Sequence, residues 1–183
     1  MHKSELRIRM RAQKSLLQPD EQRSAARRVF DTLRSMAAFV MADNVLLYHS
    51  LPDELSTREF IASLPEGKKY YLPRVNGPDL DILPYTASRT HLGAFHIEEP
   101  DGDDLTDINL IDLIVVPAVA YDRSCNRLGR GKGYYDRLLA NSRAIKVGVC
   151  YDFQLVDQID IDEFDVPVDF VIADGLGIIR RKK

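Results

Sequence analysis

One segment constrains the fold of this chain more than any other: the unbroken apolar run Leu113–Pro117, which reads Leu-Ile-Val-Val-Pro. A strand without polar residues is typical of the centre of a parallel sheet, where helices cover both faces. We therefore expect this segment to be a central strand of a layered α/β domain.

The rest of the chain alternates between patterns of helices and strands. Helices are predicted over 3–17, from Pro19 onward, from Ser56 onward (Ser56 and Glu59 have capping-box spacing) and over Tyr134–Asn141. Strands are predicted at Asn44–Tyr48, Lys69–Val75, Asp79–Tyr85, Ala144–Cys150 and Phe170–Ala173. This alternation predicts a three-layer αβα fold with a mostly parallel central sheet, as a single domain over residues 1–183. Residues 86–109 show no period and predict a long surface connection, and the tail Arg180–Lys183 is predicted to be frayed.

Composition excludes several classes of protein. Hydrophobic residues make up 45% and charged residues 29%, a balance that intrinsically disordered chains do not have. Two cysteines are too few for a disulfide framework. The apolar runs are far shorter than the roughly 20 residues that cross a bilayer, and the first residues lack an apolar signal core. A cytoplasmic location without a membrane contact is therefore expected.

Charge is distributed unevenly along the chain. Residues 1–34 hold nine basic and four acidic side chains, although the whole chain has a net charge of −3. A basic N-terminal segment indicates either an anionic ligand, including nucleic acid, or simply the solvated face of an amphipathic helix. Charge alone favours the solvated face.

A glycine-rich loop follows the apolar strand. Gly129, Gly131 and Gly133 occupy alternate positions, with Arg130 and Lys132 between them. Glycine lets the backbone turn tightly and bring its N–H groups close to a ligand. Backbone donors, cations and the start of a helix together predict a polyphosphate cradle. The loop is not a Walker A motif, because Tyr134 stands where Ser or Thr would hold magnesium.

Here the sequence resembles a known family. The stretch Arg127–Arg137 (Arg-Leu-Gly-Arg-Gly-Lys-Gly-Tyr-Tyr-Asp-Arg) resembles the signature of the 5-formyltetrahydrofolate cyclo-ligase, or methenyltetrahydrofolate synthetase, family. Further likenesses occur in order along the chain: Lys3-x-x-Leu6-Arg7, Tyr48–Thr57 with Glu54-x-x-Thr57 inside it, Leu72-Pro73-Arg74-Val75 and Glu99-Pro100.

The resemblance implies a reaction. 5-Formyltetrahydrofolate would be closed to 5,10-methenyltetrahydrofolate with ATP and Mg²⁺, through a phosphorylated formyl group, with release of ADP and phosphate. A formamide oxygen is a poor leaving group, which explains the need for ATP. Phosphoryl transfer mainly requires positioning and positive charge, and the loop offers both.

The resemblance also implies roles for individual residues. Arg130 and Lys132 would be catalytic, and Asp136 and Asp165 would hold the metal. Tyr48, His49, Glu54 and Tyr134 would bind the folate, with Glu54 accepting two N–H groups from the pterin. ATP would contact Lys3, Ser4, Glu5, Leu6, Arg7, Arg127, Leu128, Gly129, Arg130, Gly131, Lys132, Gly133, Tyr134 and Tyr135.

Two positions depart from the family pattern. Cys125 stands where the family usually has glycine, and we expect the neighbouring Asn126 to take over the left-handed turn conformation. Phe164 stands where the family commonly has His or Asn, immediately before Asp165.

Two other classes of function stay open on the residues alone. One is a relative of sugar-phosphate isomerases or acyl-CoA transferases, which share a layered α/β fold without ATP chemistry; the basic glycine loop argues against it. The other is an accessory protein that binds nucleic acid, and a pI of 5.8 argues against that. We expect a monomer with a small-molecule substrate and no nucleic-acid partner.

Overall fold

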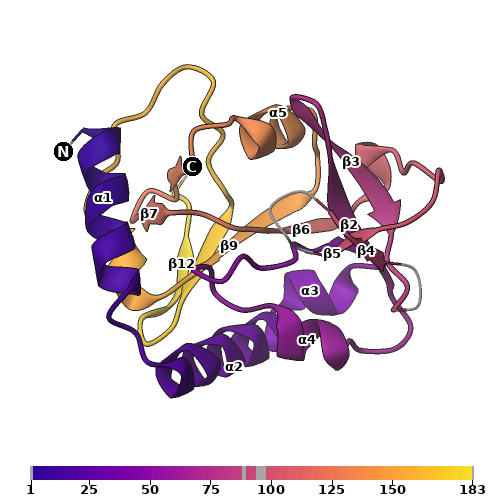
Figure 1. The fold of residues 1–183 in the computed structure, drawn as a ribbon, viewed down its shortest axis with the longest axis horizontal. Coiled ribbons are helices and arrows are strands. Elements are labelled where there is room, and N and C mark those ends of the chain that lie inside the picture. Colours follow the sequence, from indigo (N-terminus) through magenta and orange to yellow (C-terminus); the bar gives the residue numbers. More distant parts are fainter. Residues whose placement is uncertain (1, 88–89, 94–97, 183) are drawn as a thin grey trace.

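The computed structural model describes residues 2–87, 90–93 and 98–182. A seven-stranded sheet runs through its middle in the order β12-β11-β9-β6-β1-β2-β3 (Figure 1). The strands are β1 (Asn44–Leu46), β2 (Lys69–Asn76), β3 (Asp79–Pro84), β6 (Leu113–Val116), β9 (Ile145–Cys150), β11 (Phe170–Ala173) and β12 (Gly177–Arg180). All four residues of β6 are buried, and β6 is the middle strand, which confirms the prediction for the apolar run.

The sheet is parallel except at its two edges. Strands β1, β2, β6, β9 and β11 pair in parallel. The hairpin β2–β3 and the hairpin β11–β12 add one antiparallel strand at each edge. The carboxyl ends of β1 and β6 therefore lie side by side, and the loops that follow them start from the same edge.

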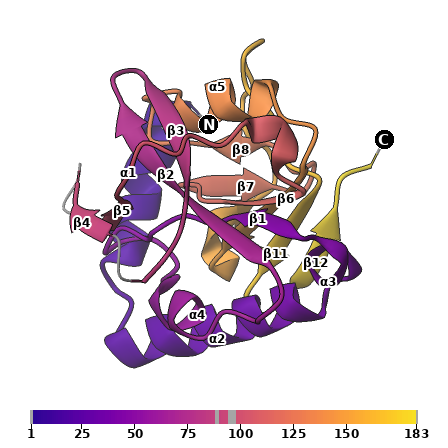
Figure 2. The ribbon, with the colours of Figure 1, turned by 90° about the vertical axis from the view of Figure 1, so that its right-hand side faces the viewer.

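Helices cover both faces of the sheet (Figure 2). On one face lie α2 (Pro19–Ser35), α3 (Ala37–Met41) and α4 (Arg58–Ala62). The rings of Phe30 and Phe60 stack there with centroids 4.6 Å apart. On the other face lies α5 (Tyr134–Ala140), whose Leu139 is buried in a second apolar cluster. The predicted αβα layering is confirmed.

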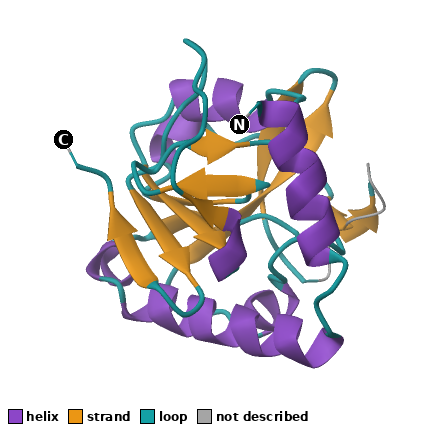
Figure 3. Ribbon diagram, turned by 90° about the vertical axis from the view of Figure 1, so that its left-hand side faces the viewer, coloured by secondary structure: helices purple, strands orange, loops and turns teal. Residues whose placement is uncertain are grey.

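A second, small sheet supports the N-terminal helix. It has the order β10-β7-β8, formed by β7 (Ala120–Asp122), β8 (Arg127–Leu128) and β10 (Leu155–Val156), with η3 (Asp152–Gln154) leading into β10. Helix α1 (Lys3–Lys14) stands beside these strands (Figure 3). Leu6 and Met10 of α1 pack with Val119, Leu128 and Ile159 in a third apolar cluster. This packing holds the basic helix against the segment that leads into the glycine loop.

Several predicted boundaries were wrong. The segment 86–109 contains a hairpin of β4 (Thr90–Leu92) and β5 (Glu98–Pro100) and the 3-10 turn η2 (Ile108–Leu110); residues 88–89 and 94–97 lie outside the described residues. The tail is not frayed from Arg180, because Arg180 pairs with Phe170 across β12 and β11. None of the described helices is long and apolar enough to span a membrane.

The capping box at Ser56 does not form. Helix α4 begins at Arg58, and its N-terminal flanking residue is Thr57. The Thr57 hydroxyl accepts instead from the Ser50 N–H at 3.0 Å, and Glu59 pairs with Arg27 of α2. A tertiary contact thus takes Glu59, which the local pattern assigned to the capping box, and the helix is flanked by Thr57 instead of Ser56.

The turn before the glycine loop keeps its left-handed residue at Cys125, with φ of 65°. The prediction that Asn126 would take this conformation was wrong. Asp122 holds the turn, because its Oδ1 accepts from the N–H groups of Ser124 and Asn126 at 2.9 Å each. These bonds fix the β7–β8 hairpin, which places Arg127 and the glycine loop.

Candidate functional site

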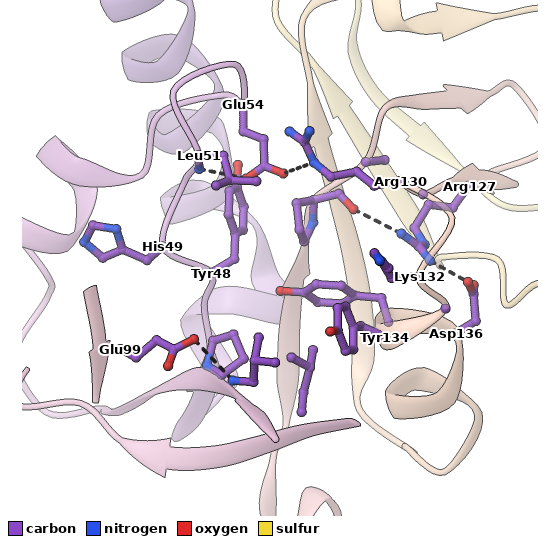
Figure 4. A pocket seen from close by; sticks show the side chains of 18 residues that line it. Tyr48, His49, Leu51, Glu54, Glu99, Arg127, Arg130, Lys132, Tyr134 and Asp136 are labelled. Atoms are coloured by element: carbon purple, nitrogen blue, oxygen red, sulfur yellow. Dashed lines mark hydrogen bonds and ion pairs between the residues drawn. The ribbon is translucent and has the colours of Figure 1, made fainter. Parts of the chain in front are cut away.

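A cavity of about 270 Å³ opens where the loops after β1 and β6 meet the β2–β3 hairpin. Most of the residues predicted to bind folate or phosphate line it (Figure 4). The lining residues are Tyr48, His49, Leu51, Glu54, Pro73, Val75, Leu80, Glu99, Pro117, Ala118, Arg127, Gly129, Arg130, Lys132, Gly133, Tyr134, Tyr135 and Asp136. The cavity therefore joins segments from the first half of the chain to the glycine loop of the second half.

The glycine loop forms one wall and has the backbone that the pattern predicted. Gly131 and Gly133 have positive φ angles of 98° and 71°, a conformation that other residues rarely adopt. Helix α1 reaches the loop, since Arg7 Nε donates to the Gly129 carbonyl at 2.9 Å. Helix α5 has only seven residues, so the loop's own N–H groups and its cations are the groups that could receive an anion.

Two of the cations near this loop, Arg127 and Lys3, are paired with carboxylates. The Arg127 side chain, which is 4% exposed, donates through Nη2 to Asp136 Oδ1 at 2.8 Å. Lys3 Nζ lies 2.5 Å from Asp165 Oδ2 and 2.7 Å from Asp162. Burial alone would lower the pKa of Lys3, but its hydrogen bonds to Asp162 and Asp165 and their charges outweigh burial. Burial alone would raise the pKa of Asp165, but the hydrogen bond from Lys3 and the charge of Lys3 outweigh it. The pKa of Lys3 is therefore raised and that of Asp165 lowered.

The two carboxylates predicted to hold metal lie in neighbouring segments. Asp136 Oδ1 also accepts from the N–H of Val166, the residue after Asp165, at 3.4 Å. Two carboxylates with phosphate oxygens and water make a donor set that suits Mg²⁺. No cluster of three or more His, Cys, Asp or Glu side chains able to hold a metal occurs among the described residues. The protein's own donors thus fit Mg²⁺ when phosphate completes the set.

A second part of the cavity wall presents Glu54 from a loop that Thr57 holds in place. Thr57 and Ser50 exchange two hydrogen bonds of 3.0 Å, each side chain accepting from the other's backbone N–H. These bonds close the loop that carries Glu54, whose side chain is 10% exposed. Glu54 Oε2 accepts from the Leu51 N–H at 3.0 Å, and Oε1 faces Arg130 Nε at 3.3 Å. The spacing Glu54-x-x-Thr57 therefore has a structural reason.

Aromatic side chains complete the cavity. Tyr48 is buried, and its hydroxyl donates to the Leu55 carbonyl at 2.7 Å. Burial raises the pKa of Tyr48 and of Tyr135 well above the ordinary value for tyrosine, so both phenols stay neutral. The rings of Tyr134 and Tyr135 line the wall beside Lys132. A flat, uncharged ring system would fit between these surfaces.

Some predicted nucleotide residues lie apart from the cavity wall. Leu6 and Leu128 are buried in the apolar cluster under α1, so only their backbone is available to a ligand. The side chains of Ser4 and Glu5 are exposed on the first turn of α1. Lys3, Arg7 and Gly131 lie outside the cavity lining, as does the predicted metal ligand Asp165, although Arg7 contacts the glycine loop.

Three charged residues of the site were missed in the sequence. Glu99 lines the cavity at 4% exposure and accepts from the Val75 N–H at 3.3 Å. Asp53 contacts Arg130, and Lys14 contacts Asp53. Only the Glu99-Pro100 motif gave a signal for Glu99. Lys14 and Asp53 look like ordinary surface charges in the sequence.

The cysteines offer no reactive thiol. Both are free and buried. Burial raises the pKa of Cys125 to about 11 and raises that of Cys150 further, so both thiols stay protonated near neutral pH.

Comparisons with known proteins agree on one family. Residues 1–174 match the sequence profile of the 5-formyltetrahydrofolate cyclo-ligase family. The 5-formyltetrahydrofolate cyclo-ligase of Escherichia coli K12 is 31% identical over 174 residues, which cover 90% of this chain and 96% of that protein. The Haemophilus influenzae enzyme of the same name is 31% identical over 178 residues, covering 91% and 94%.

Solved structures show the same fold. The solution structure of Aquifex aeolicus 5,10-methenyltetrahydrofolate synthetase superposes with a TM-score of 0.90 at 33% identity, covering all of this chain and 94% of that one. A synthetase of the same name from Mycoplasma pneumoniae has a TM-score of 0.75 at 23% identity, covering 94% and 98%, and supports the fold alone.

Proposed function

Because the chain belongs to the 5-formyltetrahydrofolate cyclo-ligase family and is a ligase, we propose that it closes 5-formyltetrahydrofolate to 5,10-methenyltetrahydrofolate with ATP and Mg²⁺. One observation supports this most: Glu54 and the glycine loop line the same cavity, where Glu54 Oε1 lies 3.3 Å from Arg130 Nε. A pterin at Glu54 and a triphosphate at the loop would therefore meet inside it. We further propose that the protein acts in the cytoplasm as a monomer.

The chemistry follows from the substrate. The formyl oxygen attacks the γ-phosphorus of ATP, ADP departs, and the formyl carbon becomes electrophilic. N10 then attacks this carbon, the phosphate leaves with the former formyl oxygen, and N10 loses its proton. The protein must hold the two substrates in line and supply positive charge at the transferring group.

The glycine loop and helix α1 bind the nucleotide in this proposal. The N–H groups of residues 129–133 and the Lys132 ammonium face the phosphates, and Lys132 stabilises the charge that develops during transfer. Arg7 holds the loop through the Gly129 carbonyl at 2.9 Å. Lys3 and Arg127 approach the phosphates from the two sides where they now pair with Asp165 and Asp136.

Glu54 binds the pterin, and Arg130 lies at the junction of the two substrates. Two carboxylate oxygens match two adjacent N–H groups on the pterin edge. Arg130 belongs to the glycine loop, yet its guanidinium points to Glu54 (Figure 4). A residue in this position borders both the formyl group and the phosphate that it receives. Tyr48, His49 and Tyr134 flank the ring.

Asp136 and Asp165 would hold Mg²⁺ together with phosphate oxygens. The bound ion supplies charge neutralisation between the phosphates and orients the γ-phosphate. Arg127 and Lys3 now neutralise the same carboxylates, so the cations and carboxylates exchange partners when Mg²⁺ and ATP bind.

An isotope experiment tests the proposed phosphorylated intermediate. Substrate labelled with ¹⁸O in the formyl group should transfer the label to the released inorganic phosphate in each turnover. Recovery of the label in water, with unlabelled phosphate, would mean that the formyl oxygen never bonds to phosphorus.

A further inference from the structure

Four charged side chains of alternating sign form a row beside the cavity. Lys14 Nζ lies 3.7 Å from Asp53 Oδ2, and Asp53 Oδ1 lies 2.5 Å from Arg130 Nη2. Arg130 Nε lies 3.3 Å from Glu54 Oε1. The row connects the last turn of α1, the loop that carries Glu54, and the glycine loop. Only Arg130 and Glu54 have a role in the proposed function.

Lys14 is placed where an ammonium group is costly. Its side chain is only 5% exposed. Burying an ammonium group costs free energy unless an opposite charge compensates for the lost hydration. Burial is the largest effect on the pKa of Lys14 and lowers it, while Asp53 acts in the opposite direction. The buried cation is stabilised by an ionised Asp53, so the two groups fix each other's position.

Asp53 is held in its ionised form by two cations. Burial by itself would raise the pKa of Asp53, but the hydrogen bond from Arg130 and the charge of Lys14 outweigh it and lower the pKa. Asp53 is 47% exposed, so its carboxylate would otherwise be free to move with the loop. Lys14 anchors it from the protein side.

Asp53 competes with Glu54 for the same guanidinium. Arginine and carboxylate prefer a two-pronged arrangement with two parallel hydrogen bonds. Arg130 gives Nη2 to Asp53 at 2.5 Å and leaves only Nε for Glu54, at 3.3 Å. Glu54 therefore makes a single, longer contact with Arg130. An Arg130 released by Asp53 would be able to turn both nitrogens toward Glu54.

We infer that Asp53, anchored by Lys14, is a positioning residue that prevents Arg130 from closing a two-pronged ion pair with Glu54. Glu54 then keeps a carboxylate edge available for the N–H groups of the pterin. This inference rests on the proposed function, because it takes Glu54 as the folate carboxylate. The relevant quantity is the affinity for folate, not the rate of phosphoryl transfer.

Equilibrium binding of 5-formyltetrahydrofolate without ATP tests the inference. Asp53→Asn should raise the Kd for the folate on the order of tenfold, because Arg130 becomes a competitor for Glu54. The Kd for MgATP should stay within about twofold, since a substitution whose effect is confined to another site leaves that binding free energy almost unchanged. Asp53→Glu should recover most of the folate affinity. Lys14→Met should weaken folate binding in the same direction, and thermal unfolding checks that each variant is folded.

A double-mutant cycle separates positioning from a general effect on the loop. In an Arg130→Met background, Asp53→Asn should cause no further loss of folate affinity. An equal loss in both backgrounds, or a change confined to MgATP affinity, would overturn the inference. Glu54→Gln tests the proposed function separately. If this variant binds folate as tightly as wild type, Glu54 does not bind the pterin. If Glu54→Gln weakens folate binding while Asp53→Asn and Lys14→Met do not, the positioning role of Asp53 is contradicted and the folate-binding role of Glu54 stands.

Discussion

Arg127 and Asp136 neutralise each other across 2.8 Å at the wall of the cavity. One is a cation proposed for the nucleotide and the other a carboxylate proposed for the metal. Lys3 and Asp165 repeat the arrangement at 2.5 Å. If ATP bound without a metal ion, its phosphates would pair with the two cations. The two carboxylates would then be unpaired next to the phosphates and would repel them. Mg²⁺ restores the balance, so the two should bind as a unit.

Asp136→Asn should therefore have two opposite effects. The variant should need more Mg²⁺ for half-maximal activity, because a metal ligand is lost. It should also bind metal-free ATP more tightly than wild type, because Arg127 is no longer held by a carboxylate. A Mg²⁺ titration of activity and calorimetry with ATP plus EDTA measure the two effects. Asp165→Asn should act in the same directions.

Asp157→Asn is a matched control for this pair of measurements, because Asp157 is exposed and lies outside the cavity lining. Unchanged metal titrations for both Asp136→Asn and Asp165→Asn would show that neither carboxylate is a metal ligand. Only the phosphate cradle would then remain of the proposed site.

Lys3→Met should reduce stability in a pH-dependent way. In the folded protein the pKa of Asp165 is lowered from 3.8. Burial alone would raise this pKa, but the hydrogen bond from Lys3 and the charge of Lys3 outweigh burial. The pair therefore stabilises the fold above about pH 4, and this contribution is lost as the pH falls through the lower folded pKa. The gap in melting temperature between wild type and Lys3→Met should be present at pH 7 and shrink below about pH 4.

Arg9→Met is the control, since Arg9 is exposed on the same helix. If the gap stayed constant down to the acid limit, Lys3 would not be stabilised by an ionised Asp165.

Lys132→Ala should nearly abolish turnover in a folded protein. Lys132 is exposed between two glycines at the cavity wall and supports no part of the core. Loss of a group that stabilises charge in the transition state costs on the order of 10²–10³ in rate. Steady-state kinetics measure kcat, and Lys69→Ala, at an exposed strand end, is the control. A kcat/KM close to wild type would contradict the catalytic role.

Glu54→Gln should raise the KM for the folate far more than the KM for ATP. The amide keeps one acceptor oxygen but loses the charge and the second acceptor. Hydrogen bonds to a charged group contribute about 1.5–3 kcal/mol, which corresponds to roughly tenfold to a hundredfold in affinity. Glu66→Gln, an exposed glutamate outside the cavity, serves as control. An effect on the KM for ATP alone would contradict the assignment of Glu54 to the folate.

Six of the seven strands of the main sheet were predicted, because they have strong local patterns, whereas the edge strand β12 was missed. The apolar run at β6 and the strand Phe170–Ala173 were identified with little or no error in their boundaries. Strands β7, β8 and β10 were missed, since two or three residues are too few to show a period of two. The capping box at Ser56 failed because Arg27, a long-range partner, took Glu59, and the helix began only at Arg58.

The segments that form the site were predictable from the sequence, but the ion pairs between their side chains were not. The glycine loop and Glu54 were identified from motifs, and both line the cavity. Arg130 pairs with residues 76 and 77 positions away, and nothing local to the sequence indicates such a contact. Lys14 belongs to a helix whose basic residues resemble a solvated face, yet it is buried. Burial and pairing arise from tertiary structure, which local patterns do not encode.

The most direct measurement follows the absorbance of methenyltetrahydrofolate when the purified protein is mixed with 5-formyltetrahydrofolate. The signal should appear only when both ATP and Mg²⁺ are present, with one ADP released for each methenyl group formed. It should be lost in Lys132→Ala. Methenyl formation that proceeds equally without ATP, or ATP hydrolysis without methenyl formation, would contradict a ring closure driven by phosphorylation in this cavity.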